Sequence, residues 1–455
     1  MEDERQIIEG YMERARRAFD EVADWDQTQT DEAVRVIGKA IFDNADELAA
    51  MAAEETAMGI AEDKAAKNRN KARIIWNDLK DKNSVGIVDR DEKTGIVTMA
   101  KPMGIVAAIT PATNPIVTPM SNAMFAVKGR NAIIISPHHR AVNCSGKAVE
   151  YINKALSDIG APEHLVQILT QHSRENTRLL MASADVVIST GGAGMVKAAY
   201  SSGRPALGVG AGNVQCIVDD DADLKKAVPL IVTGRTFDNG ILCSAEQSII
   251  INKSRYEELR GLLLANNTYI VENPDEREGL RKALFPDGAM NPGLIGQSTG
   301  KVAAAANIDI PADTRMIAVL ADKCGKEDLF AREKMFPVVA IFLCGNFKGA
   351  VEIAAANLET EGAGHSVSIH SNDTANIEYA ALRLPVSRIV VNQCSATATG
   401  GSFRNGLAPT NTLGCGSWGG NSISENLTYK HLLNYSRVAY YLDEKPIPDD
   451  NEIWG

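Results

Sequence analysis

Apolar side chains recur at helical spacing through the first eighty residues of the chain. Leu48, Met51 and Ala52 stand at positions i, i+3 and i+4, within stretches rich in Ala, Glu and Lys. This period of about 3.6 residues predicts amphipathic helices. Beyond them, two apolar stretches flank the charged, turn-rich residues 89–94, which predicts a β-hairpin over residues 85–100.

From residue 104 onward the pattern changes to short, fully apolar runs separated by helical segments. Runs of this kind, without period-two alternation, are typical of a parallel sheet covered by helices on both faces. We therefore expect a doubly wound nucleotide-binding domain that binds its ligand at the carboxyl ends of the strands. The predicted strands are residues 104–110, 131–135, 165–169 and 185–189, and the predicted helices are residues 120–128, 144–156 and 175–182.

A second α/β stretch follows, so the expected fold class is α/β with two doubly wound domains. We place a cofactor-binding domain at residues 1–235, a catalytic domain at 236–415, and a C-terminal segment that returns to the cofactor domain at 416–455. After the Gly-, Ser- and Asn-rich residues 400–424 we expect a helical stretch. The predicted strands are residues 214–218, 248–251, 315–320, 338–342, 366–369 and 388–391, with helices at 224–232, 256–265 and 347–357.

Charge and composition argue against several classes of protein. The chain has 455 residues, with 47 Lys and Arg against 58 Asp and Glu, and a formal net charge of −11. Proteins that bind DNA or anionic membranes carry a basic surface, so neither partner is expected. No apolar run approaches the ~20 residues of a membrane span, and the acidic N-terminus does not resemble a signal peptide. Seven cysteines without a CxxC pair indicate a reduced, cytoplasmic chain with no metal site.

Three segments, two that follow predicted strands and one that precedes a predicted strand, are candidates for cofactor binding. The sequence GGAG at residues 191–194 precedes a helix, whose first backbone N–H groups favour phosphate; a plain structural turn is the alternative. The sequence SPHHR at 136–140 has two His and an Arg where dinucleotide folds place an acid on the ribose. It would tolerate a 2′-phosphate, unless it is only a solvated loop. The dense glycines of residues 208–213 indicate a close approach of the backbone to another group, or a tight turn.

Cys243 by itself does not indicate catalysis, because a lone cysteine is more often a buried apolar residue than a nucleophile. Its interpretation depends on the motifs in the rest of the chain. Collinear motifs cover nearly the whole chain: PMGIV at 102–106, TNP at 113–115, SPH at 136–138, GVGAGN at 208–213, DNGILCSAEQ at 238–247, EKMFPV at 333–338, EGAGH at 361–365, TLGCGSWG at 412–419 and NSISENL at 421–427. Together they resemble the aldehyde dehydrogenase superfamily, specifically its CoA-acylating branch. Within that branch they are most similar to the CoA-dependent succinate-semialdehyde dehydrogenases.

The resemblance implies roles for individual residues. Cys243 would attack the aldehyde as a thiolate, and its backbone N–H and the Asn114 amide would hold the oxyanion. Glu333 would bind the nicotinamide ribose, and His365 would assist the CoA thiol. The alternatives are an Asx-turn for Asn114, a surface acid for Glu333 and a structural imidazole for His365. The implied cofactor-binding set is Thr110, Pro111, Ser136, His138, Arg140, Gly191, Gly192, Gly194, Gly208, Gly210, Glu333 and Met335.

Gly208 departs from the pattern of the hydrolytic aldehyde dehydrogenases. Those enzymes carry a glutamate at the matching position, and that carboxylate activates the water that hydrolyses the thioester. Glycine offers no base, so the thioester would persist until a better nucleophile arrives. The free thiol of coenzyme A is such a nucleophile, since part of it ionises near neutral pH.

The sequence leaves open which aldehyde is the substrate and whether the cofactor is NADP or NAD. The resemblance implies a reversible reaction of aldehyde, CoA and NADP or NAD, with succinate semialdehyde as the aldehyde and Arg404, Ser395 and Thr397 as its binding residues. Sulfoacetaldehyde, short-chain aldehydes such as acetaldehyde or propionaldehyde, and a non-catalytic nucleotide-binding relative are the alternatives. The hairpin at 85–100 resembles the oligomerisation element of the family, so a homodimer or homotetramer is expected.

Overall fold

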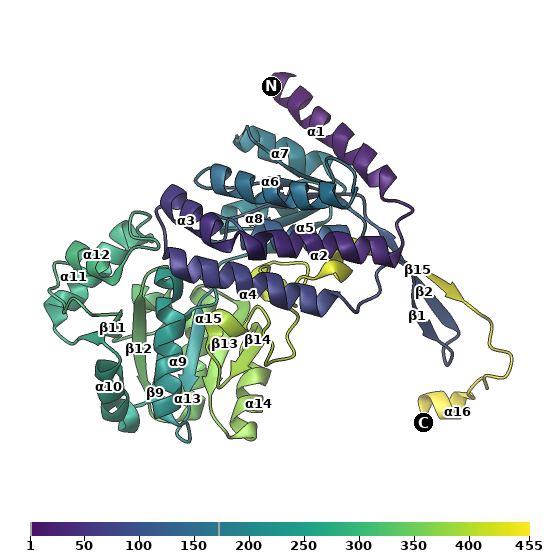
Figure 1. Ribbon diagram of the computed structural model, residues 1–455. Coiled ribbons are helices and arrows are strands. Elements are labelled where there is room, and N and C mark those ends of the chain that lie inside the picture. The colour runs from purple at the N-terminus through teal and green to yellow at the C-terminus, as the bar shows by residue number, and fades with distance from the viewer. Residues whose placement is uncertain (1, 172) are drawn as a thin grey trace.

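The computed structural model describes residues 2–171 and 173–455, which form two parallel sheets and one small antiparallel sheet (Figure 1). The first sheet has five parallel strands in the order β5-β4-β3-β6-β7. Strands β3 and β4 are buried along their whole length, as their unbroken runs of Ile, Val and Ala predict. The strands are β3 (Ile105–Ile109), β4 (Ala132–Ser136), β5 (Val166–Ile168), β6 (Val186–Thr190) and β7 (Ala206–Val209).

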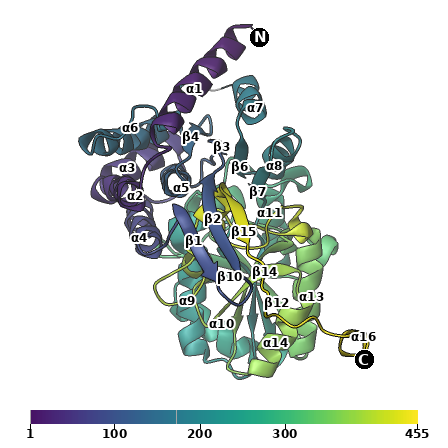
Figure 2. The same ribbon diagram turned by 90° about the vertical axis from the view of Figure 1, so that its right-hand side faces the viewer.

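Helices cover both sides of this sheet, with α5 and α6 on one side and α7 and α8 on the other (Figure 2). The prediction of helices in the first eighty residues is confirmed, and the last of these helices, α4, runs along the junction between the two parallel sheets (Figure 1). The bounds are α1 (Glu2–Glu21), α2 (Gln27–Asp43), α3 (Ala45–Thr56), α4 (Ala61–Leu79), α5 (Val117–Lys128), α6 (Val142–Asp158), α7 (Arg174–Ser183) and α8 (Ala193–Tyr200).

The second sheet has seven parallel strands in the order β10-β11-β12-β9-β8-β13-β14. The expected α/β class with two doubly wound sheets is therefore confirmed. The strands are β8 (Val214–Val218), β9 (Glu246–Asn252), β10 (Thr268–Val271), β11 (Met316–Leu320), β12 (Val338–Cys344), β13 (Gly364–His370) and β14 (Val386–Val391). The helices are α9 (Leu224–Thr236), α10 (Tyr256–Ala265), α11 (Pro274–Leu284), α12 (Thr299–Ala305), α13 (Phe347–Thr360), α14 (Thr374–Arg383) and α15 (Ser395–Ala398).

The division between the two sheets differs from the predicted boundary at residue 235. Strand β8 pairs with β9 and β13, so it belongs to the second sheet. The chain therefore passes between the sheets after Val209 and before Val214. The prediction failed here because β8 is as apolar as the strands before it, and apolar character alone does not reveal which sheet a strand joins.

A small antiparallel sheet extends away from both parallel sheets (Figure 1). The predicted hairpin is confirmed as β1 (Gly86–Asp91) paired with β2 (Ile96–Pro102). The helical stretch expected after residue 424 was wrong, because only the single 3₁₀ turn Tyr429–Leu432 precedes strand β15 (Leu433–Ala439), which pairs with β2. The short helix α16 (Asp450–Trp454) lies near the C-terminus.

The segment before β15 returns to the first domain. Leu427, Tyr429, Leu432 and Leu433 are buried in the core that contains β3 and β4. Among the described residues, no helix has both the length and the apolar character that crossing a bilayer requires.

Asn131 ties this returning segment to the first sheet. Its Oδ1 accepts hydrogen bonds from the backbone N–H groups of Met103 (2.7 Å) and Gly104 (2.9 Å). Its Nδ2 donates to the carbonyls of Ala126 (3.1 Å) and Leu432 (2.9 Å). The side chain is fully buried, so the Met103 and Gly104 N–H groups and the Leu432 carbonyl depend on it for a partner, whereas the Ala126 carbonyl also accepts the Gly129 and Asn131 N–H groups.

Replacing Asn131 by alanine should leave the N–H groups of Met103 and Gly104 and the carbonyl of Leu432 without this side-chain partner. We expect Asn131→Ala to lower the midpoint of thermal unfolding by about 5 °C or more, measured by differential scanning fluorimetry. The control is Asn434→Ala, whose exposed amide makes one bond to the Pro102 carbonyl and which should shift the midpoint by less than about 1 °C. Equal shifts for the two variants would contradict the bridging role of Asn131.

Candidate active site

Cys243 follows an unusual turn between α9 and β9. In the 3₁₀ turn Phe237–Gly240, Asp238 has φ 53° and Asn239 has φ 54°, in the left-handed region that Asp and Asn tolerate better than most residues. Gly240 continues at φ 73°, where a Cβ atom would lie 2.6 Å from the Phe336 carbonyl oxygen. This turn sets the direction in which the chain enters the Cys243 loop.

Cys243 and Asn114 line one cavity of about 280 Å³. The structure therefore brings together the two residues expected to act as nucleophile and oxyanion donor, although they come from different domains. Thr397 lines the same cavity, as expected for a substrate-binding residue. The other lining residues are Ala66, Lys67, Asn70, Lys71, Phe237, Leu242, Ser244, Ala396, Gly400, Thr410, Asn411 and Leu413.

The glycine-rich residues 208–213 do bring the backbone close to another group, and that group is the nucleophile loop. A Cβ atom at Gly212 would lie 1.9 Å from the Cys243 carbonyl oxygen, so only glycine fits there. At Gly208, a Cβ atom would lie 2.7 Å from Val196 Cγ1 and 2.9 Å from Tyr200 Cε2. The Tyr200 hydroxyl also accepts the Gly208 N–H at 2.9 Å. A longer side chain at position 208 would therefore have to displace Tyr200.

Glu333 is buried beside this loop and accepts the Gly212 N–H at 3.1 Å. Burial and the neighbouring Glu361 raise the pKa of its carboxyl to about 8, although the Gly212 hydrogen bond opposes the shift. At neutral pH Glu333 is therefore largely protonated and can donate a hydrogen bond.

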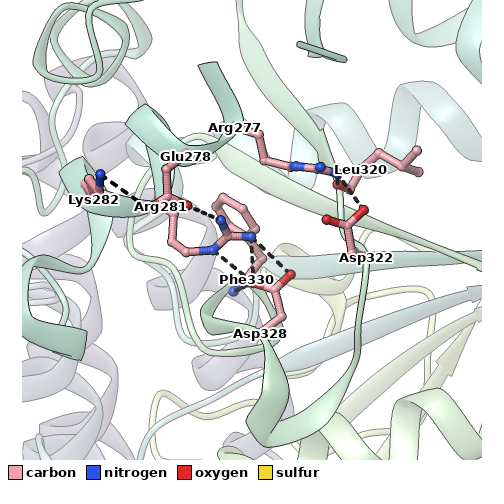
Figure 3. A network of polar contacts seen from close by, with 8 residues as sticks. All are labelled: Arg277, Glu278, Arg281, Lys282, Leu320, Asp322, Asp328 and Phe330. Atoms are coloured by element: carbon pink, nitrogen blue, oxygen red, sulfur yellow. Dashed lines mark hydrogen bonds and ion pairs between the residues drawn. The ribbon is translucent and has the colours of Figure 1, made fainter. Parts of the chain in front are cut away.

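An ion-pair network fixes the segment that leads to Glu333 (Figure 3). Arg281 of α11 contacts the Asp328 carboxylate at 3.4 Å and lies over the Phe330 ring at 4.8 Å. Asp328 Oδ1 in turn accepts the Phe330 N–H at 3.1 Å. The turn at residues 328–330, which precedes Glu333, is therefore held in place by these contacts.

Burial dominates the ionisation of Cys243. It raises the pKa of the thiol to about 12, with smaller contributions from Glu333 and Cys415, while the positive charge of Arg388 acts in the opposite direction. Cys243 is accordingly a neutral thiol at pH 7 in this structure. Its side chain is partly exposed to the cavity, so reagents and substrates can reach it.

His365 is fully buried and is not among the residues that line the cavity. Its Nδ1 pairs with the Ser366 hydroxyl at 2.7 Å, and its Nε2 has no protein partner within the described part of the chain. Burial, assisted by the charge of Arg388, lowers the pKa of the imidazole to about 3. His365 is therefore neutral, with one buried ring nitrogen that has no hydrogen-bond partner in the described structure.

Most of the expected cofactor residues lie at the carboxyl edge of the first sheet, whereas Glu333 and Met335 precede β12 of the second sheet. The strand order reverses between β3 and β6, which is where open α/β sheets bind ligands. Thr110 and Pro111 follow β3, Ser136 ends β4, His138 and Arg140 follow β4, Gly191 and Gly192 follow β6, Gly208 and Gly210 stand at the end of β7, and Glu333 and Met335 precede β12. Gly194 already lies inside α8, so the expected turn is shorter than predicted.

These residues fit a dinucleotide. Thr110 Oγ1 is buried and has no partner in the described part of the chain. A Cβ atom at Gly192 would meet nothing within 4 Å, so the backbone there borders open space. Ser136 differs from the rest because its hydroxyl already pairs with Thr177 Oγ1 at 2.9 Å.

Two of the three expected substrate-binding residues lie elsewhere. Arg404 is exposed and does not line the cavity, because its turn is closed by hydrogen bonds of Ser402 and Asn405 that leave the side chain in solvent. Ser395 is fully buried, and its hydroxyl pairs with Thr399 at 3.0 Å. Arg404 was predicted because the family resemblance places its loop at the pocket, and that resemblance does not determine side-chain direction.

The cations of the cavity come instead from α4. Lys71 Nζ donates to the carbonyls of Gly400 (2.8 Å) and Thr410 (3.1 Å), and no carboxylate of the described residues lies within ion-pair distance of it. Burial and the charge of Lys67 lower the pKa of Lys71 to about 8. Neither Lys67 nor Lys71 was predicted from the sequence, although their spacing with Lys64 places all three on one helix face, among alanines that could have marked it as buried.

Comparison with known proteins gives consistent results. A sequence model described as the aldehyde dehydrogenase family matches residues 2–280. The chain is 50% identical over 448 residues to a succinate-semialdehyde dehydrogenase (acetylating) of Clostridium kluyveri, covering 98% of this chain and 99% of that protein. The crystal structure of an acetylating aldehyde dehydrogenase from Geobacillus thermoglucosidasius superposes with a TM-score of 0.94 at 38% identity, covering 98% of this chain and 99% of that one. A propionaldehyde dehydrogenase of Rhodopseudomonas palustris, solved with bound CoA and an acylated cysteine, gives a TM-score of 0.87 at 26% identity, covering 95% and 97%.

The raised pKa of Cys243 has a direct consequence for its reactivity. Only the thiolate reacts with iodoacetamide, so without cofactor the alkylation rate of Cys243 should rise about tenfold per pH unit from pH 7 to pH 10. The rate is followed by mass spectrometry of the peptide that carries Cys243, and Cys243→Ala gives the background from other cysteines. A plateau between pH 7 and pH 9 would contradict a thiol pKa of about 12.

Proposed function

The chain belongs to the aldehyde dehydrogenase family, and from that premise we propose that it catalyses reversible CoA-acylating oxidation of succinate semialdehyde with NADP or NAD. The products are succinyl-CoA and the reduced nicotinamide. The observation that carries the proposal is the convergence of Cys243 and Asn114 on one cavity, while Gly208 offers no carboxylate to activate water.

Carbon–sulfur bond formation begins the reaction. The Cys243 thiol first loses its proton to solvent. The thiolate sulfur then attacks the aldehyde carbon, and the carbonyl electrons move to the oxygen, which the Asn114 amide N–H stabilises. When the oxyanion collapses, the hydride leaves the same carbon and a thioester remains on Cys243. Bound NAD(P)⁺ supplies the hydride acceptor and a positive charge beside the sulfur. That charge acts in the same direction as Arg388, which already favours the thiolate.

Transfer of the acyl group to CoA completes the cycle. The CoA sulfur attacks the thioester carbon, the bond to Cys243 Sγ breaks, and the thiol proton of CoA leaves the site. Neutral His365 lies outside the cavity with an unpaired Nε2, and if CoA binding uncovers this nitrogen, it would accept a hydrogen bond from the incoming thiol. Its low pKa makes it a weak base, so its contribution is orientation of the thiol more than removal of the proton.

Lys71 favours an anionic aldehyde. Its partly buried ammonium lines the cavity and has carbonyl partners but no carboxylate in the described structure. A substrate carboxylate would supply the missing counter-charge and a charge-assisted hydrogen bond. The 50% identical relative is named for succinate semialdehyde. Sulfoacetaldehyde carries a negative charge as well and is the second candidate.

The protein is also proposed to be a cytoplasmic homo-oligomer, a dimer or a tetramer. The small antiparallel sheet and the tail behind it expose apolar side chains, among them Ile87, Val438, Tyr440 and Tyr441. Exposed apolar surface of this kind is typical of an interface. All seven cysteines are unpaired, which fits a reducing compartment.

The reaction is tested by leaving out one component at a time. Omission of CoA should reduce steady-state NAD(P)H formation from succinate semialdehyde by about 100-fold or more, since the thioester then has no acceptor. Cys243→Ala should lose activity by about 10⁴-fold, as when other covalent nucleophiles are removed. Rapid CoA-independent formation of free acid would overturn the acylating assignment, and retained activity in Cys243→Ala would overturn the nucleophile.

The substrate assignment is tested with Lys71→Met. Loss of a buried charge-assisted hydrogen bond should lower kcat/KM for succinate semialdehyde by about 10- to 100-fold, while kcat/KM for butyraldehyde changes by less than about threefold. Arg404→Gln is the matched control, because that side chain is exposed, and it should leave both substrates unaffected. Equal losses for both aldehydes in Lys71→Met would show that Lys71 serves the fold and not substrate choice.

A further inference from the structure

One buried ammonium, that of Lys67, links the expected oxyanion donor Asn114 to the turn that precedes the expected nucleophile Cys243. Lys67 Nζ donates to Asn114 Oδ1 at 2.8 Å and to Asp238 Oδ2 at 2.8 Å. Asp238 belongs to the turn that leads to Cys243. We propose that Lys67 is a positioning residue that fixes the orientation of the Asn114 amide and its position relative to the nucleophile loop.

The chemistry of the ammonium determines which way the amide faces. A lysine Nζ carries three donors and no acceptor, so the atom of Asn114 that it contacts has to be the carbonyl oxygen. Rotating the amide by 180° would place its NH₂ group against the ammonium and would lose the hydrogen bond. The NH₂ group is therefore directed away from Lys67, and it has no partner within the described structure. Asn114 lines the cavity, so this N–H is available to an oxyanion on Cys243.

Asp238 is itself held from several directions. Its Oδ1 accepts the Ile60 N–H at 2.8 Å, and its own N–H donates to Asp63 Oδ2 at 2.8 Å. The α3–α4 turn closes over it, since a Cβ atom at Gly59 would lie 1.9 Å from Asp238 Oδ1. The carboxylate is completely buried. Because these contacts hold Asp238 in place, the Lys67 ammonium that binds it is held in place as well. Lys67 in turn fixes the position of the Asn114 amide oxygen.

The charge of Lys67 adds to its geometric role. An ammonium on the oxygen side of an amide polarises it and makes its N–H a stronger donor. In a buried site this effect is poorly screened. Asp238 keeps the ammonium compensated, and the pKa of Asp238 lies below its ordinary value because Lys67 and Lys64 together outweigh the cost of burial.

Lys64 provides a matched control within the same network. It donates to the same Asp238 oxygen at 3.0 Å and is equally buried, but the structure shows no contact between it and Asn114. A purely structural function of the network predicts similar consequences for loss of either lysine. A positioning function predicts that only Lys67 affects the chemistry.

The test is a double-mutant cycle between Lys67→Met and Asn114→Ala, read as kcat with succinate semialdehyde, CoA and NADP⁺ or NAD⁺. Asn114→Ala should lower kcat by about 10²- to 10³-fold, as expected for loss of an oxyanion donor. Lys67→Met should lower kcat by about 10- to 100-fold with little change in KM. In the Asn114→Ala background it should have an effect of less than about threefold, because there is no amide left to orient.

Lys64→Met completes the design. It should lower the thermal midpoint about as much as Lys67→Met and change kcat by less than about threefold. The proposal is overturned if the Lys67 and Asn114 losses multiply, or if Lys64→Met reproduces the kcat loss. If Lys67→Met does not fold, Lys67→Gln, which keeps a donor without the charge, is measured in the same cycle with the same criterion. The proposal rests on the proposed function, and the two fail separately: an inactive wild-type enzyme refutes the reaction, whereas multiplicative losses in active enzyme refute only the positioning.

Discussion

The buried carboxylate of Asp238 is the interaction on which the arrangement of the site depends. A fully buried ion is costly unless each of its oxygens is bonded, and here Ile60, Lys64 and Lys67 supply the donors. The two lysines come from α4, whereas Asp238 belongs to the turn before Cys243. Satisfying one carboxylate therefore fastens the N-terminal helices to the nucleophile loop. Lys67 extends the connection to Asn114 at the start of α5.

Close backbone packing provides the second constraint around the nucleophile. Gly212 lies against the Cys243 carbonyl, and a Cβ atom at Gly364 would lie 1.8 Å from the Cys415 carbonyl oxygen. Arg388 then closes the gap between β14 and the C-terminal segment, donating to the carbonyls of His365 and Gly414. These contacts hold residues 208–213, the start of β13 and the C-terminal segment close together without a large side chain between them. The loops around Cys243 therefore have little freedom to shift.

The same burial acts on each ionisable group of the site in the direction that favours its neutral form. It raises the pKa of the Cys243 thiol and the Glu333 carboxyl and lowers that of the His365 imidazole. A neutral thiol reacts slowly with oxidants, because the thiolate is the reactive form. The lysines of α4 keep their place through carbonyl and carboxylate partners, so the cavity remains a favourable environment for an anion.

The sequence by itself determined the fold class, the hairpin, most strands and the motif around Cys243, because these depend on local periodicity and on residue types at fixed spacing. It also indicated, through the glycines of residues 208–213, that the backbone would pass close to another group. Only the tertiary structure decided that β8 joins the second sheet, that Arg404 faces solvent, and that Lys67 and Lys71 line the cavity. Strand partners and side-chain directions depend on contacts between residues far apart in the chain. Such contacts leave little trace in local composition. A lysine on a helix is therefore predicted to be exposed unless the element that covers it is known.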